Sequence, residues 1–326
     1  DPRRSGRRAE PDRPAAAGVT ARPRYAPYQN GEAGFRIGLQ PLDPADWIEP
    51  DEAAPAQFAN KARLLRERPG DILAALPESL AAGDEALARL AAFLPARFPG
   101  LYRRDGDAME VRPAGWTVDL ADPALPAIGR AGLLVQEDLC LMQADDAGGW
   151  RLTAASLAAP NAWRLADKLG RAMPGIHAPV PLYGETLAGR IDRIFTHLRD
   201  GAPVWRLNWS VMSDPALFQP GAHDRSPERL AGLTRANAGE RLVLRVERQT
   251  LTRLPESGAI LFTIKTHIDP LAAIAGRPEL VEGLSRAVLQ MPREMAAYKA
   301  LEPIRAALTG WLDDQRAHQD ERRPPS

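Results

Sequence analysis

The stretch that sets the fold is residues 241–266, RLVLRVERQTLTRLPESGAILFTIKT. Strand-forming residues fill both of its ends, over 241–250 and 259–266. Between them, residues 254–258 supply the proline, serine and glycine of a tight turn. We therefore expect two antiparallel strands joined as a hairpin, and a sheet built around them.

Two of the expected strands carry polar side chains on one face, because side chains alternate along a strand. The two polar rows are Arg206, Asn208 and Ser210 in the strand at 204–212 and Arg245, Glu247 and Gln249 in the strand at 241–250. If such residues are buried, they need internal partners or a ligand. The alternative is a solvated sheet face with ordinary cross-strand ion pairs.

Further elements follow outward from this region. The remaining expected strands are 132–142 and 150–155 around a turn at 145–149, and the expected helices lie before residue 99 and at 183–198, 278–291 and 294–312. The order is helices, two strands, a helical connector, three strands and helices. This order predicts an α+β fold, an antiparallel sheet of about five strands with helices packed on one side.

Composition limits the class of protein. The chain has 326 residues, with 42 Lys plus Arg against 42 Asp plus Glu, so no overall field attracts nucleic acid or an anionic membrane. Residues 1–24 and 313–326 are charged and proline-rich, so we expect them to be disordered around a single domain at 25–312. No apolar run approaches the roughly 20 residues of a membrane span, and no apolar segment follows the first arginines, so we expect a cytoplasmic protein.

Cysteine chemistry has little scope in this chain. Cys140 is the only cysteine, which leaves no internal disulfide, no CxxC pair and no thiolate cluster. It lies in an apolar run, so we expect a core residue.

Two of the five histidines are candidate ligands. His177 precedes Pro179 and Pro181, which make its loop rigid, but its ring could equally bond a loop carbonyl. His267 ends an expected strand and suits a site or a turn. No histidine pair has the spacing of a helical zinc site, whereas a haem needs only one imidazole and an apolar slot.

Several short motifs follow one another in a distinctive order. They are FRIGL at 35–39, Trp47-Ile48, Lys61, IHAPVP at 176–181, RLNWS at 206–210, ERQTL at 247–251 and FTIKT at 262–266. In this order and spacing they resemble the family of the α subunit of haem-dependent oxidative N-demethylase. The resemblance extends from about Tyr25 to Trp311.

The resemblance implies a PAS-like domain that holds haem b in the helical connector of its sheet, with helical extensions at both ends. It also implies an enzyme that uses O2 to convert dimethylamine to methylamine and formaldehyde. Partner subunits with FMN, a 2Fe–2S cluster and tetrahydrofolate are implied, with NADPH as the electron source.

The resemblance also implies roles for residues. It favours His177 over His267 as the axial ligand. We assign catalysis on the distal face to Arg206, Asn208 and Glu247, and contact with the haem to Trp209, Arg245, Gln249 and Lys265, the last as a cation for a propionate. Two other hypotheses remain open at this point: a haem-binding gas or redox sensor without turnover, and a structural domain without a cofactor.

Overall fold

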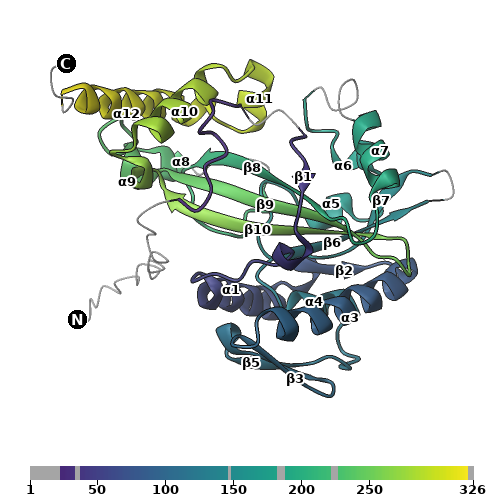
Figure 1. The fold of residues 1–326 in the computed structure, drawn as a ribbon. Coiled ribbons are helices and arrows are strands. Elements are labelled where there is room, and N and C mark those ends of the chain that lie inside the picture. Colours follow the sequence, from purple (N-terminus) through teal and green to yellow (C-terminus); the bar gives the residue numbers. More distant parts are fainter. Residues whose placement is uncertain (1–22, 34–36, 146–147, 182–187, 222–226, 322–326) are drawn as a thin grey trace, which may run out of the picture.

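The computed structural model describes residues 23–33, 37–145, 148–181, 188–221 and 227–321. Within these residues the fold is α+β, around a seven-stranded antiparallel sheet in the order β1-β8-β9-β10-β6-β7-β2 (Figure 1). Its strands are β1 (Gln40–Pro41), β2 (Leu73–Ala75), β6 (Asp138–Ala144), β7 (Trp150–Ser156), β8 (Val204–Met212), β9 (Val243–Arg253) and β10 (Ile260–Pro270).

A second, three-stranded antiparallel sheet lies below α3 in Figure 1 and was not expected from the sequence. It consists of β3 (Tyr102–Asp105), β4 (Ala108–Val111) and β5 (Trp116–Asp119). The helices of the described residues are α1 (Ala54–Glu67), α2 (Pro69–Ile72), α3 (Leu80–Arg97), α4 (Ala127–Gly132), α5 (Leu165–Lys168), α6 (Met173–Ile176), α7 (Ala188–His197), α8 (Pro227–Leu230), α9 (Ala238–Arg241), α10 (Pro278–Leu289), α11 (Arg293–Tyr298) and α12 (Glu302–Glu321).

The β9–β10 hairpin is confirmed. All eleven residues of β9 pair with all eleven of β10, from Val243 opposite Pro270 to Arg253 opposite Ile260. The large sheet has two more strands than expected, because the short strands β1 and β2 pair with its outer strands β8 and β7.

Helices cover both faces of the sheet, which corrects the expectation of a single helical side. On β6, Leu139 and Leu141 pack into the core formed with α1, α3 and α4. The alternate residues Cys140 and Met142 pack into a different core with α6 and α7. The continuous apolar run of β6 is typical of a strand that is buried on both faces.

The strand expected at 132–142 begins only at Asp138, because residues 127–132 form α4. This helix packs tightly against β7. A side chain at Gly132 would place its Cβ 2.1 Å from the Ser156 hydroxyl oxygen, so only glycine allows this approach.

The C-terminal helical region also differs from the expectation. The helix expected at 294–312 is divided into α11 and α12 at Ala300, whose φ of 47° is left-handed. Helix α12 continues to Glu321, so residues 313–321 are helical. Arg316 ties this part of the helix to Glu282 of α10 at 3.2 Å. Of the N-terminal segment expected to be disordered, residues 1–22 lie outside the described part of the chain.

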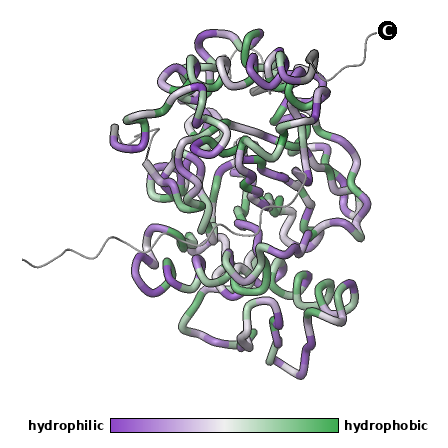
Figure 2. Tube along the Cα trace, turned by 90° about the vertical axis from the view of Figure 1, so that its left-hand side faces the viewer, coloured by the Kyte–Doolittle hydropathy of each residue, from purple (hydrophilic) through white to green (hydrophobic). Residues whose placement is uncertain are grey.

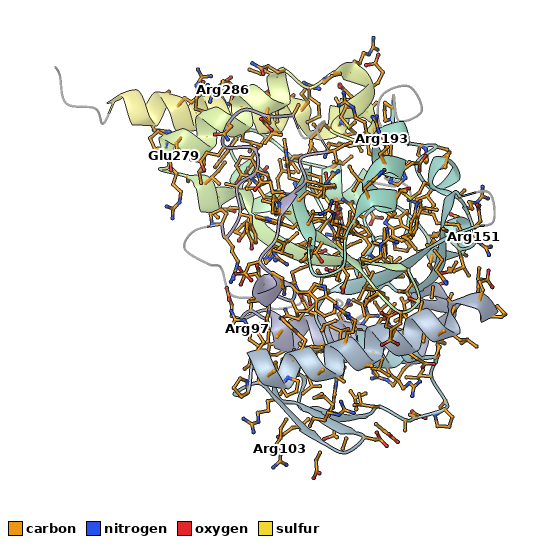
Figure 3. All side chains as sticks on the ribbon, turned by 45° about the vertical axis from the view of Figure 1, so that its right-hand side comes forward. Arg97, Arg103, Arg151, Arg193, Glu279 and Arg286 are labelled. Atoms are coloured by element: carbon orange, nitrogen blue, oxygen red, sulfur yellow. The ribbon has the colours of Figure 1, made fainter. Side chains whose placement is uncertain are left out.

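Charged groups divide into an outer and an inner set. Figure 3 labels six that project from the surface: Arg97, Arg103, Arg151, Arg193, Glu279 and Arg286. Hydrophilic residues also occur along the strands in the middle of the molecule (Figure 2). No helix in the described residues is both long enough and apolar enough to span a membrane.

Lys61 of α1 is one of these inner charges and joins the helix to the sheet. Its Nζ donates hydrogen bonds to the carbonyl oxygens of Gly132, Val135 and Glu137, at 2.8, 2.7 and 2.9 Å. Burial lowers the pKa of Lys61 to about 8. The ammonium thereby satisfies three carbonyls in the irregular segment between α4 and β6.

We predict that Lys61→Met lowers the free energy of unfolding by about 2–4 kcal/mol, because the buried carbonyls lose their donor. Urea denaturation measures the change. Arg63→Met is the matched control on the same helix, since Arg63 is largely exposed and pairs only with surface groups. It should shift the free energy by no more than about 0.5 kcal/mol. Equal destabilisation by the two substitutions would contradict the role of Lys61.

Candidate functional site

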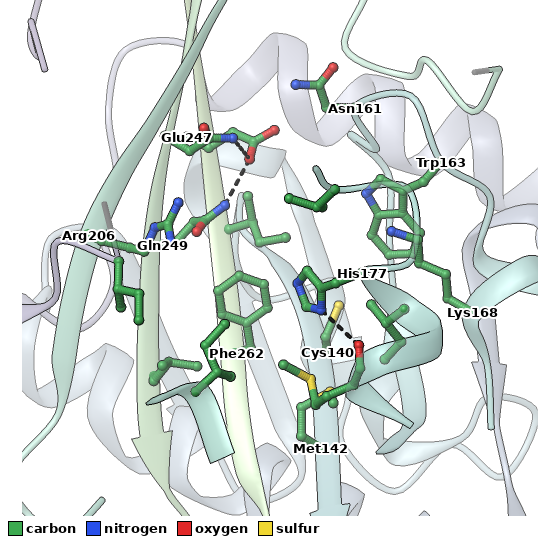
Figure 4. A pocket seen from close by; sticks show the side chains of 18 of the residues that line it. Cys140, Met142, Asn161, Trp163, Lys168, His177, Arg206, Glu247, Gln249 and Phe262 are labelled. Carbon is green, nitrogen blue, oxygen red and sulfur yellow. Dashed lines mark hydrogen bonds between the residues drawn. The ribbon is translucent and has the colours of Figure 1, made fainter. Parts of the chain in front are cut away.

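A cavity of about 310 Å³ lies between the sheet and the helices of the connector (Figure 4). One face of β6, β8, β9 and β10 forms one wall, while α5, α6, α7 and α11 contribute the others. Its volume falls within the roughly 300–1,000 Å³ of small-molecule and cofactor sites. The apolar lining includes Leu39, Cys140, Met142, Leu152, Met173, Ile176, Ile191, Ile194, Phe195, Leu251 and Phe262.

The two predicted polar rows meet on this wall. In the register of β8 and β9, Asn208 lies opposite Glu247 and Arg206 lies opposite Gln249. The Glu247 Oε2 accepts hydrogen bonds from the amides of Asn208 at 3.4 Å and Gln249 at 2.9 Å. All four residues line the cavity.

The polar rows of β8 and β9 do not form a solvated sheet face, so the alternative interpretation of these rows as solvent-exposed is wrong. Glu247 is 7% exposed and Ser210 is 6% exposed, and both line the cavity. Ser210 Oγ and Arg206 Nε are buried without a hydrogen-bond partner within the described residues. Unsatisfied polar groups of this kind are costly to bury, which favours a ligand that meets them.

His177 enters the cavity from the end of α6, and its ring lies near the centre of Figure 4. Its Nδ1 is 3.1 Å from the carbonyl oxygen of Met173. A carbonyl only accepts, so Nδ1 carries the hydrogen and Nε2 carries the lone pair of the neutral ring. Burial, with help from Lys168 and Arg206, lowers the pKa of His177 to about 4. The imidazole is therefore neutral near pH 7.

The described lining has more cations than anions. Lys168, Arg206 and Lys299 line the cavity, and Glu247 is the acid among the described lining residues. The Lys168 ammonium lies 4.5 Å from the centre of the Trp163 ring. Burial lowers the pKa of Lys168 and of Arg206, and lowers that of Lys299 to about 8. The cavity is suited to anionic groups near these cations.

Arg245, predicted to contact a cofactor, shares the cavity face of β9 with Glu247 but does not line the cavity. It is fully buried, and its Nε is 3.6 Å from Glu247 Oε1. Its guanidinium also donates to the carbonyls of Leu217 and Ala159. Arg245 therefore supports Glu247 from the neighbouring position on the same face of β9 and does not line the cavity itself.

Lys265 and Trp209 lie on the opposite face of the sheet, which corrects their assignment to cofactor contact. Lys265 Nζ is 2.9 Å from Asp51 Oδ1. Trp209 packs edge-on against Tyr28, with ring centres 5.6 Å apart. The physical reason is alternation: Trp209 lies between two cavity residues of β8, and Lys265 pairs in register with Arg248, which faces away from the cavity.

His267, the rival ligand, shares that opposite face. Its ring nitrogens lie 3.3 Å from Glu49 and 3.6 Å from Asp51. The sheet separates it from the cavity. The structure thus brings His177 together with the polar rows and places His267 in a separate cluster of charges.

The sequence interpretation missed several lining residues, among them Cys140, Trp163, Lys168 and Lys299. Alternation along β6 could have found Cys140, because its neighbours Leu139 and Leu141 pack on the other side. Nothing in the local sequence indicates Lys299, which reaches β8 across 90 residues to donate to the Trp209 carbonyl.

Backbone strain is concentrated at the cavity. Within the described residues, the non-glycine residues with positive φ are Ala162, at 60°, and Ala300, at 47°. Ala162 lies between Asn161 and Trp163, and Ala300 follows Lys299, all three of which line the cavity. Such conformations cost on the order of 1–3 kcal/mol each and are typical of functional sites.

Fold and site together define a class: an α+β protein with a partly apolar cofactor-sized cavity, one neutral histidine and a buried polar row on the facing sheet. A comparison with protein families gives the particular assignment. The family described as haem-dependent oxidative N-demethylase, alpha subunit-like, matches residues 38–309. The chain belongs to this family. Its description names haem dependence, oxidative chemistry and one subunit of a larger assembly.

Cys140 is the chain's only cysteine and it lines the cavity, so alkylation of the chain measures how accessible this one side chain is. We predict that its thiol reacts with iodoacetamide at least about 100-fold more slowly than a free thiol, because burial raises its pKa and limits access. The rate should still be rising above pH 9, since the thiolate fraction grows until the raised pKa is reached. Mass spectrometry of timed samples measures it, with guanidinium-unfolded protein as the control. Rapid alkylation of the folded protein would contradict the burial of Cys140.

Proposed function

We propose that the cavity binds haem b with His177 as the axial ligand. The observation that carries this proposal is the position of His177, whose ring lines the cavity with its Nδ1 3.1 Å from the Met173 carbonyl oxygen. A neutral imidazole whose other ring nitrogen donates to a backbone carbonyl is the usual way that a protein presents a histidine to iron. The apolar side chains beside the ring suit the face of a macrocycle.

The polar residues of the cavity also fit a haem. The two propionates of haem are anionic, and the cations Lys168 and Arg206 line the same cavity as His177. Arg206 Nε is buried without a partner within the described residues, and a propionate oxygen would satisfy it. We assign the propionates to these two residues.

We further propose that the domain is PAS-like. The five long strands of the large sheet stand in the order β8-β9-β10-β6-β7, with the short β1 and β2 at the two edges. The connector between β7 and β8 lies over one face and contains α6, which ends at His177. The resemblance to haem-binding PAS domains implies this placement of the ligand.

The proposed reaction is oxidative N-demethylation of a small amine such as dimethylamine. Dimethylamine, O2, NADPH and H⁺ give methylamine, formaldehyde, water and NADP⁺; one O2 atom leaves in formaldehyde and the other in water. Bound haem supplies the O2 and one-electron chemistry. The protein binds the amine, orients it and keeps the reacting groups away from water.

Glu247 is the residue that we assign to the amine. Its carboxylate lines the cavity, and the Asn208 and Gln249 amides fix its orientation. A carboxylate held in a buried site makes charge-assisted hydrogen bonds with an ammonium. Arg206, Asn208 and Gln249 supply hydrogen-bond donors on the same wall.

Electrons must come from outside this chain, which has no GxGxxG nucleotide motif and no cysteine cluster. As an α subunit, it is expected to work with other subunits. We propose that a partner with FMN and a 2Fe–2S cluster delivers electrons from NADPH, that a tetrahydrofolate subunit receives the formaldehyde, and that the complex works in the cytoplasm.

We predict about one haem b per wild-type chain, with the ferrous–CO absorption of an imidazole-ligated haem, and little or no haem in His177→Ala. The pyridine haemochromogen assay gives the stoichiometry. His197→Ala is the matched control, since His197 is exposed on α7. His267→Gln should also keep its haem, because the sheet separates His267 from the cavity. Haem retained by His177→Ala but lost from His267→Gln would sink the assignment.

We predict that dimethylamine perturbs the haem spectrum and stimulates O2 uptake in the presence of a reductant. In Glu247→Gln its affinity should fall by about 10-fold or more, as expected for the loss of a charge-assisted hydrogen bond worth roughly 1.5–3 kcal/mol. Difference spectra measure the affinity. Equal binding by both proteins would make Glu247 a structural partner of Arg245. Tight O2 binding without amine-dependent uptake would favour the gas-sensor hypothesis.

A further inference from the structure

Ser210 places a buried hydroxyl on the cavity wall. The residue is 6% exposed, it lines the cavity, and its Oγ has no hydrogen-bond partner among the described residues. Asn208, two residues earlier on β8, lines the cavity as well, as alternation along a strand requires. A buried hydroxyl without a partner is costly, so a ligand in the cavity that bonds to it recovers part of that cost.

The Glu247 carboxylate lies diagonally across the sheet from Ser210. Glu247 pairs in register with Asn208, and Ser210 is the next residue of β8 on the same face. Diagonal neighbours of this kind are about 7–8 Å apart along the backbone, which long side chains can span. The Glu247 Oε2 accepts hydrogen bonds from the amides of Asn208 and Gln249. Its Oε1 lies 3.6 Å from Arg245 Nε, which is beyond hydrogen-bond distance, so Oε1 is the oxygen that a ligand can use.

The nearby cations are engaged within the protein. Arg245 lies opposite Ser210 in register, but it does not line the cavity, and its guanidinium donates to two loop carbonyls. Lys299 does line the cavity and donates to two oxygens of β8. The groups that this end of the cavity offers to a ligand are therefore two acceptors, Ser210 Oγ and Glu247 Oε1.

Two acceptors suit an ammonium that has two N–H groups. In dimethylammonium the tetrahedral nitrogen carries two hydrogens and two methyl groups. The hydrogens can point to Ser210 Oγ and Glu247 Oε1, while the methyl groups turn toward the apolar lining of the cavity. A serine hydroxyl has two lone pairs, so it accepts such a bond without a change of its own protonation.

Amines with a different number of N–H groups match this pair of acceptors less well. Trimethylammonium has one N–H, so it leaves one oxygen unpaired and brings a third methyl group against it. Methylammonium has three, one of which finds no acceptor in the pair. A site built to hydrogen-bond a substrate group discriminates strongly against an analogue that lacks the group, because a buried polar atom of the site is then left unpaired.

We infer that Ser210 selects secondary amines: its Oγ accepts one N–H of the substrate ammonium, and Glu247 Oε1 accepts the other. This inference rests on the proposed N-demethylation and assigns a specificity-determining residue to it. It also concerns the product, because demethylation turns an ammonium with two N–H groups into one with three. The product therefore matches the two acceptors less well than the substrate does, which favours its release.

The experiment compares wild type with Ser210→Ala, and Ser213→Ala is the matched control. Ser213 is also buried and follows the end of β8, but it does not line the cavity. Calorimetry and haem difference spectra of the full chain give the affinities for dimethylamine, trimethylamine and methylamine. We expect wild type and Ser213→Ala to bind dimethylamine at least about 10-fold more tightly than the other two. In Ser210→Ala the affinity for dimethylamine should fall about 10-fold, and that for trimethylamine should stay within about twofold.

Urea denaturation separates ligand recognition from a structural role of Ser210. Without amine, Ser210→Ala should be at least as stable as wild type, because alanine buries no unpaired hydroxyl. Saturating dimethylamine should then stabilise wild type more than the variant, since it binds wild type more tightly. A Ser210→Ala variant that keeps the full preference for dimethylamine, or that is clearly less stable without amine, would overturn the inference.

Failure of this inference differs from failure of the proposed function. Haem binding and dimethylamine-dependent O2 uptake, with an amine preference that Ser210→Ala leaves unchanged, would remove only the role of Ser210. A chain without haem in the pyridine haemochromogen assay would remove the proposed oxidation. Calorimetry on that haem-free chain still measures the preference among the three amines, and the role of Ser210 is decided by it.

Discussion

Charges on the central strand β9 are buried on both faces of the sheet, and the rest of the structure depends on how they are paired. Arg245 is 0% exposed and Arg248 is 3% exposed, and they point to opposite faces. Arg248 reaches Glu49 at 3.3 Å, while Arg245 reaches the carbonyls of Ala159 and Leu217. Removing one partner of a buried ion pair costs about 3–5 kcal/mol of folding free energy. The contacts of the two arginines therefore hold loops from distant parts of the chain against the sheet.

The two faces use their polar residues differently. On the face away from the cavity, Lys265 pairs with Asp51 and Arg248 lies 3.3 Å from Glu49, so charge meets charge within the protein. On the cavity face, Ser210 Oγ is buried without a partner among the described residues. The cavity face also forms the wall of the cavity, which is why we place ligand recognition on that face.

Much of the sheet was predictable because alternation and turn chemistry are local. Strand β8 has the bounds expected, and the polar rows of β8 and β9 share a face as expected. The same rule places Trp209 on the far side, and applying it strictly would have excluded this residue from the cavity. The orientation of Lys265 depends on the β9–β10 register, which the turn sequence does not fix. Lys299 depends on the packing of α11 against β8, a tertiary contact between residues 90 positions apart.

Asn208 links two charged side chains at the polar end of the cavity. An amide both donates and accepts, so one side chain holds Lys299 on its oxygen and Glu247 on its nitrogen. A carboxylate at this position would repel Glu247, and an aliphatic residue would leave both charges without a bridging group. Asn208 therefore ties the end of α11 to the sheet through Lys299, and it orients the Glu247 carboxylate at the cavity wall.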